Sequence, residues 1–231
     1  MVETTDTVND TTLRWSGIIA SGIDAESFLQ GQLSQDITLV GGGAWALLLA
    51  PDGIVITSTF VTRIGDGYLL QVPRELADVA LARLTRFLLR TKCTLEVSDI
   101  ERGPFATLRE RIDAGRPGPT EFAAGLTPQC FGKSFVATSV SFTKGCFTGQ
   151  ELVGRLDARG SSVPWRMVRA SGPNAARIDE VLTSKGPAGT SGLTTSMDDG
   201  TSVVGLGFAH RSLFGSSELE RSLDVRVEEL P

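Results

Sequence analysis

Apolar and polar residues follow two patterns over the first hundred positions of the chain, short apolar runs and helical spacing. Short apolar runs, rich in β-branched residues, predict strands at 13–20, 45–49, 54–61, 68–72 and 95–97. Apolar residues recur at helical spacing over 74–90, and Asp24 is suited to cap another helix that begins after it. The order β-α-β-β-β-α-β predicts an α+β fold with a mostly antiparallel sheet and its helices on one face.

Turn residues organise the rest of the chain. Pro51, Asp52 and Gly53 predict a hairpin, because proline presets its φ and glycine accepts a positive one. A helix is expected within 105–114, followed by a glycine- and proline-rich loop over 115–130. Short strand candidates then predict a small β-barrel or sandwich; they lie at 165–170, 189–195, 203–209 and 223–227. We therefore expect a disordered tail over 1–12, an α+β region over 13–162 and a C-terminal β-barrel over 163–231.

Composition narrows the class of protein. Lysine and arginine number 22 against 27 acids, and the net charge of −5 argues against a nucleic-acid partner. The longest apolar run, 44–50, is far shorter than the ~20 residues that span a bilayer, so no membrane role is expected. The three widely spaced cysteines form no CxxC pair, which argues against a disulfide framework and a metal site. With no leader pattern at its start, the chain is expected to be cytoplasmic.

The segment 141–151 contains the densest group of candidate functional side chains. Lys144 lies two residues before Cys146, so in extended backbone both side chains would share a face and the ammonium would favour the thiolate. Gly145 lets the backbone approach a flat ligand, and Phe147 supplies a ring for stacking. The competing interpretation is that Cys146 is a small buried hydrophobe, which is the role we assign to the other two cysteines.

The same segment ends in an amide and a carboxylate, at Gln150 and Glu151. A carboxylate can accept two parallel N–H bonds from an amino-pyrimidinone edge, as in a pterin. The segment therefore predicts a site that combines a thiol, a cation, a ring and a carboxylate.

The string K-G-C-F-T-G-Q-E at 144–151 closely resembles the signature of the YgfZ family of folate-binding proteins. These proteins are relatives of the glycine-cleavage T-protein, an aminomethyltransferase, and are linked to iron–sulfur cluster assembly or repair. Residues 22–36 and 111–117 are similar to two further segments of the family. The resemblance covers most of residues 13–230.

The resemblance implies a ring of lobes around a central hole that holds tetrahydrofolate or a derivative, followed by a small β-barrel. It would divide the region 13–162 into two interlocked lobes. It implies that Cys146 is the essential thiol. It also implies that Arg111 is the cation for the site or for the folate glutamate tail. The cofactor-binding residues that it implies are Lys144, Gly145, Phe147, Gln150, Glu151, Arg111, Gln30, Gln32 and Asp36. The expected partners are folate and iron–sulfur client or assembly proteins, and the chain is expected to be a monomer.

The chain departs from the family pattern at three places. Aminomethyltransferases carry an aspartate in the strand after the hairpin turn, whereas residues 53–58 contain no acid. The loop 115–130 is shorter than in the family, and Phe147 lacks the hydroxyl of the alternative tyrosine. These departures favour a folate-binding maturation factor over an enzyme. The alternatives are a folate-dependent aminomethyl or one-carbon transferase, and a non-catalytic interaction module that has lost the ligand.

Overall fold

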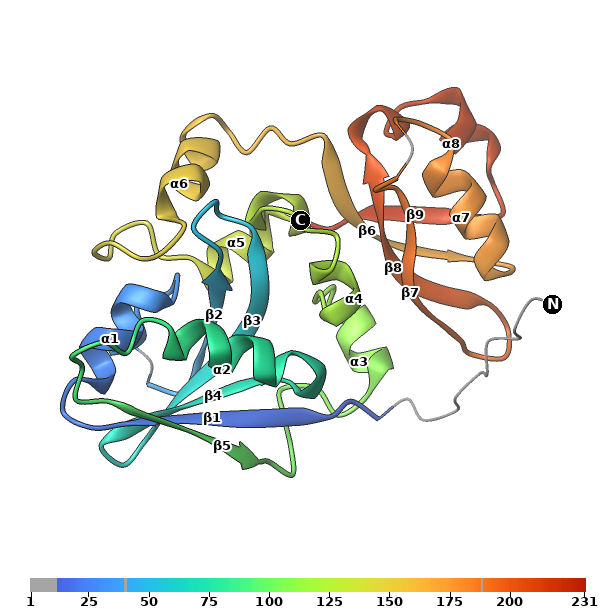
Figure 1. Ribbon diagram of the computed structural model, residues 1–231. Coiled ribbons are helices and arrows are strands. Elements are labelled where there is room, and N and C mark those ends of the chain that lie inside the picture. Colours follow the sequence, from blue (N-terminus) through green and yellow to red (C-terminus); the bar gives the residue numbers. More distant parts are fainter. Residues whose placement is uncertain (1–11, 40, 188) are drawn as a thin grey trace.

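The computed structural model describes residues 12–39, 41–187 and 189–231, which form two antiparallel sheets with helical segments between them (Figure 1). Except for Thr12, the predicted tail lies outside the described residues. The first sheet has the strand order β2-β3-β4-β1-β5. Its strands are β1 (Trp15–Ser21), β2 (Ala44–Leu49), β3 (Val55–Ile64), β4 (Gly67–Pro73) and β5 (Thr94–Asp99). The predicted α+β class and antiparallel pairing are confirmed.

Helices α1 (Ala25–Gln32) and α2 (Ala77–Thr85) cover one face of this sheet, as predicted (Figure 1). Short 3-10 helices at Ile37–Leu39 and Arg74–Leu76 flank them. The prediction of a single helix over 74–90 was wrong at both ends. Val79 is 52% exposed and Leu89 85% exposed, so the apolar residues of 74–90 do not form one continuous buried stripe.

The expected cap of α1 by Asp24 was also wrong. No side-chain bond caps this helix, because the Asp24 carboxylate accepts a 2.7 Å bond from the backbone nitrogen of Lys92. The side chain therefore ties the start of α1 to the residues that lead into β5 instead of satisfying the first turn of its own helix.

Strand β2 is buried on both faces, which explains its wholly apolar sequence. Leu48 packs with the core under α1 and α2, whereas Leu47 and Leu49 pack on the other side with Phe131 and Phe135. The second core comes from the segment that connects the two sheets. Both faces of the first sheet are thus covered near β2.

The connecting segment contains helices α3 (Leu108–Asp113), α4 (Pro119–Phe122), α5 (Lys133–Ser139) and α6 (Gln150–Ala158). Thr107 and Glu110 form a capping box at α3. The predicted loop over 115–130 was wrong in part, because it holds α4 and most of a 3-10 helix at Pro128–Phe131. Proline at the start of each short helix fits the first turn, and Phe122 and Phe131 anchor them in the core.

The second sheet has the order β7-β8-β6-β9 and packs against helix α7 (Ala175–Thr183). Its strands are β6 (Trp165–Gly172), β7 (Gly192–Asp198), β8 (Val203–His210) and β9 (Arg226–Glu229); a 3-10 helix at Arg211–Leu213 and α8 (Ser217–Arg221) follow β8. Among the described residues the sheet is open, with β7 and β9 at its edges, so closure into a barrel and the division near 162 stay predictions. No described helix has the length and apolar character that crossing a bilayer requires.

Candidate functional site

The loop 141–149 is fixed to the end of helix α1. The backbone nitrogen of Ser141 donates to the Ser34 carbonyl at 2.9 Å, and that of Thr148 donates to the Gly31 carbonyl at 3.1 Å. Between them, Lys144 Nζ lies 2.7–3.0 Å from three carbonyl oxygens, those of Gln30, Leu33 and Gln35. These contacts cap the carboxyl end of α1, which has no basic residue in its own last turn.

Two more of the predicted site residues join this cluster. Gln30 Oε1 lies 3.1 Å from Lys144 Nζ, and Gln30 Nε2 donates to Asp36 Oδ1 at 2.8 Å. Burial lowers the pKa of Lys144 to about 8, and the Asp36 carboxylate opposes this shift. The hydroxyl of Thr38 lowers the pKa of Asp36. These bonds bring Gln30, Asp36 and Lys144 together and hold the loop in place, and their role in binding a cofactor stays a prediction.

Cys146 carries the accessible thiol. Of the three cysteines, Cys146 is exposed, whereas Cys93 and Cys130 are buried. Burial raises the pKa of both buried thiols. The described bonds of the Lys144 ammonium all go to α1 and the residues after it, so its expected support of the Cys146 thiolate stays a prediction.

The other predicted residues of this segment do not converge on one cavity. Phe147 is buried in the core with Val153. Gln150 opens α6 and accepts a 3.4 Å bond from the Phe147 backbone. The Glu151 side chain is 86% exposed and pairs with Arg155 at 2.6 Å, one turn along α6. Nothing lies within 4 Å of a Cβ placed at Gly145, which leaves open space there.

The Gln32 side chain bonds to helix α2. Its Oε1 accepts a 3.1 Å bond from Arg83 Nη1, and Arg83 Nη2 donates to the Leu49 carbonyl. The predicted role of Gln32 in ligand binding stays a prediction.

Arg111 forms a buried ion pair with Glu121, which is fully buried. Arg111 Nη1 lies 2.8 Å from Glu121 Oε2, and the backbone nitrogen of Gly118 donates to the same oxygen at 2.7 Å. The hydroxyls of Thr194 and Thr195 on β7 donate to Glu121 Oε1 at 2.6 and 2.5 Å. The cluster therefore joins α3 and α4 to the second sheet, and Glu121 neutralises the charge expected to bind a ligand.

A cavity of about 220 Å³ lies beside this ion pair, and Arg111 forms part of its wall. Trp15, Trp45 and Phe105 give it an aromatic side, and the rings of Trp45 and Phe105 stack with centroids 6.0 Å apart. Ser58 lies on its wall, in the strand where the sequence lacks the aspartate of aminomethyltransferases. We call this space the aromatic cavity.

Arg116 supplies a cation to the aromatic cavity. Its guanidinium lies 4.1 Å from the centroid of the Trp45 ring, within cation–π range. Among the described residues, no carboxylate lies within ion-pairing distance of it, and burial lowers its pKa to about 10. Arg116 was missed as a site residue although it lies in the quoted segment 111–117. A half-buried cation beside aromatic rings suits a flat ligand that carries a negative group.

Comparisons with known proteins support the fold. No family model matches the chain. An uncharacterized protein of Haemophilus influenzae is 24% identical over an alignment 187 residues long, and the match covers 63% of this chain and 67% of that protein. Glycine cleavage system aminomethyltransferase T from Bartonella henselae has a similar structure, with a TM-score of 0.56 and 15% identity over 87% of this chain and 80% of that chain. The chain therefore has an aminomethyltransferase-like fold, as the sequence resemblance predicted.

Proposed function

We propose that the protein binds tetrahydrofolate or a derivative in the aromatic cavity. The observation that carries this proposal is Arg116, a cation without a carboxylate partner among the described residues, set against Trp45 on the cavity wall. A folate combines a flat heteroaromatic ring with a carboxylate tail, so its two ends match these two features. Glu75 also lines the cavity and offers a carboxylate for the amino-pyrimidinone edge, the role first expected of Glu151.

Tryptophan fluorescence tests this proposal. A folate stacked beside Trp15 and Trp45 should quench their emission in a saturable way, and the quenching should persist in Trp165→Phe, which removes the only other tryptophan. Arg116→Met should weaken binding about tenfold through loss of a charge-assisted contact, whereas Arg109→Met on α3 should not. Quenching that never saturates, after correction with free tryptophan, would contradict folate binding.

We also propose that the thiol of Cys146 supports iron–sulfur cluster assembly or repair, in contact with client or assembly proteins. An exposed thiol on a loop that is tied to α1 is available to another protein, whereas the two other thiols are buried. The aromatic cavity does not include Cys146 among its described lining residues, so the thiol and the folate would act from different surfaces.

Complementation tests the thiol role. In cells that lack this protein, the wild-type chain should restore the activity of iron–sulfur enzymes, and Cys146→Ala should not. Thr143→Ala is the matched control, because Thr143 is exposed on the same loop. Full restoration by Cys146→Ala, with folding verified by circular dichroism, would refute the thiol role.

A folate-dependent aminomethyl or one-carbon transferase is the second candidate function. Glu75 favours it, because this carboxylate lines the aromatic cavity even though the strand with Ser58 lacks an acid. The candidate requires that purified protein turns over methylene-tetrahydrofolate with an amine or a lipoyl acceptor, and that Glu75→Gln abolishes turnover. No turnover with either acceptor would exclude this candidate.

A further inference from the structure

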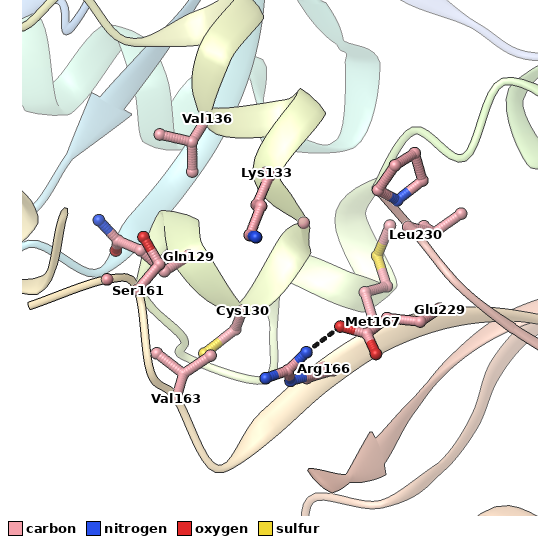
Figure 2. Close-up of a pocket in the computed structure, with 13 residues that line it drawn as sticks. Gln129, Cys130, Lys133, Val136, Ser161, Val163, Arg166, Met167, Glu229 and Leu230 are labelled. Atoms are coloured by element: carbon pink, nitrogen blue, oxygen red, sulfur yellow. Dashed lines mark hydrogen bonds and ion pairs between the residues drawn. The ribbon is translucent and has the colours of Figure 1, made fainter. Parts of the chain in front are cut away.

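The end of helix α2 and the chain that follows it, residues 83–92, carry positive charge without any acid, in a protein whose net charge is −5. We call this stretch the basic segment; its cations are Arg83, Arg86, Arg90 and Lys92. Among the described residues, no carboxylate lies within ion-pairing distance of any of them. Arg166, in the wall of the cavity beside strands β6 and β9, is by contrast paired with Glu229 (Figure 2). The basic segment is therefore a surface whose charge the described chain does not neutralise.

Two large apolar side chains lie exposed among these cations. Leu89 is 85% exposed and Phe87 is 41% exposed. The guanidinium of Arg83 lies 4.1 Å from the centroid of the Phe87 ring. It also donates to Gln32 Oε1 and to the Leu49 carbonyl, so it holds the ring at the surface. Exposed aromatic and apolar groups beside unpaired arginines are typical of a protein interface.

The backbone of Arg90 gives an independent indication. Its φ is 62°, in the left-handed region that glycine adopts without cost and that is unfavourable for a residue with a Cβ. The Arg90 side chain forms none of the hydrogen bonds or ion pairs of the described residues that would offset this cost. An arginine held in such a conformation without an internal partner points to a contact outside the chain.

The basic segment lies next to the loop that carries Cys146. Gly31 and Gln32 are consecutive residues at the end of α1. The Gly31 carbonyl accepts a bond from the backbone nitrogen of Thr148, and Gln32 accepts one from Arg83. The loop and the basic segment therefore flank the same end of α1, and a partner that covers the basic segment lies beside the exposed thiol.

We propose that the basic segment docks an acidic segment of a partner protein. Carboxylates of the partner would pair with Arg86 and Arg90, and an apolar side chain would pack against Phe87 and Leu89. Charge complementarity selects the acidic partner, and the apolar residues favour a protein over a nucleic acid, whose phosphates would leave them uncovered. The docking follows from the surface itself, whereas its use in presenting a partner to Cys146 rests on the proposed function of that thiol.

The probe for this surface is a fluorescein-labelled peptide that has a pair of leucines with a pair of glutamates on each side. Its fluorescence anisotropy should rise in a saturable way with the full chain, with a Kd below about 1 mM. Peptides with glutamine for glutamate, or with serine for leucine, should each bind about fivefold or more weakly. No saturable rise, equal affinity for the three peptides, or tighter binding of a short oligouridylate at the same salt concentration would overturn the proposal.

Matched variants place the docking site. Arg86→Met and Arg90→Gly should each weaken binding of the acidic peptide about fivefold, whereas Arg221→Met, which removes an exposed arginine on α8, should leave it unchanged. Because glycine suits the left-handed backbone, Arg90→Gly should melt at a temperature no lower than the wild type although it binds less well. Equal affinity in Arg90→Gly and Arg221→Met would contradict the assignment.

Thiol exchange tests the placement beside Cys146. The acidic peptide is extended by a flexible linker and a cysteine held as a mixed disulfide with 2-thiopyridine. The Cys146 thiolate attacks the peptide sulfur, a protein–peptide disulfide forms, and 2-thiopyridone leaves. Its release should be about fivefold faster than with the glutamine peptide and should be lost in Cys146→Ala; equal rates with both peptides would overturn the placement. Neither folate nor an iron–sulfur enzyme enters these measurements, so failure of this inference is distinguishable from failure of the proposed function.

Discussion

Replacing Arg111 by methionine should lower the free energy of unfolding by about 3–5 kcal/mol. The change leaves the Glu121 carboxylate buried between α4 and β7 with its cation removed. Breaking a buried ion pair from one side is costly, because the remaining charge has lost both its solvent and its partner. Urea unfolding of the ligand-free protein, followed by circular dichroism, measures the loss.

Arg109→Met is the matched control for this variant. Arg109 lies on the same helix, but its pairs with Asp113 and Asp199 are at the surface, where an ion pair contributes about 0–1 kcal/mol. A loss of stability in Arg111→Met no larger than in Arg109→Met would show that the Glu121 cluster does not hold α3 and α4 to the second sheet. The double variant Arg111→Met/Glu121→Leu should recover part of the loss, since it removes the stranded charge.

Replacing Lys144 by methionine should cost about 2 kcal/mol of stability, because three carbonyl oxygens at the end of α1 lose their donor. The loop that carries Cys146 would lose its attachment as well. Thermal unfolding compared with Lys92→Met, which removes an exposed lysine, measures the effect. Equal melting temperatures in the two variants would contradict the role of Lys144 in fixing the loop.

The pH dependence of the unfolding free energy, compared between the wild type and Lys144→Met, provides an independent check. Burial lowers the pKa of Lys144 from 10.5 to about 8, so between these values the unfolded chain binds more protons than the folded one. Stability contributed by this group therefore rises with pH over that window. The difference in unfolding free energy between the wild type and Lys144→Met should widen from pH 8 to pH 10. A constant difference would show that folded Lys144 stays protonated over this range and that its pKa is not lowered.

Much of the first sheet could be predicted from local patterns, because β1, β2, β3 and β4 each contain an apolar run next to turn residues. Strand β2 shows why this works: burial on both faces requires every residue to be apolar. The 115–130 segment shows where it fails. Its short helices depend on Phe122 and Phe131 reaching a core built largely from distant residues, which no local pattern reveals.

Candidate site residues could be chosen from the sequence, but the groups that they contact in the fold could not. The short separation of Lys144 and Cys146 suggested an interaction, yet the ammonium finds its acceptors more than a hundred residues earlier, at the end of α1. Arg111 and Arg116 are equivalent cations in the sequence. Only the tertiary contact with Glu121 distinguishes them, because it neutralises Arg111, whereas Arg116 has no carboxylate within ion-pairing distance among the described residues.

Calorimetric titration of tetrahydrofolate into two variants, Arg116→Met and Glu151→Ala, tests the central claim most directly. If folate binds in the aromatic cavity, Glu151→Ala should retain the wild-type affinity, because Glu151 is exposed and paired with Arg155 on α6. Arg116→Met should lose about tenfold. Unchanged affinity in Arg116→Met together with lost affinity in Glu151→Ala would move the ligand to the 144–151 loop and contradict the account.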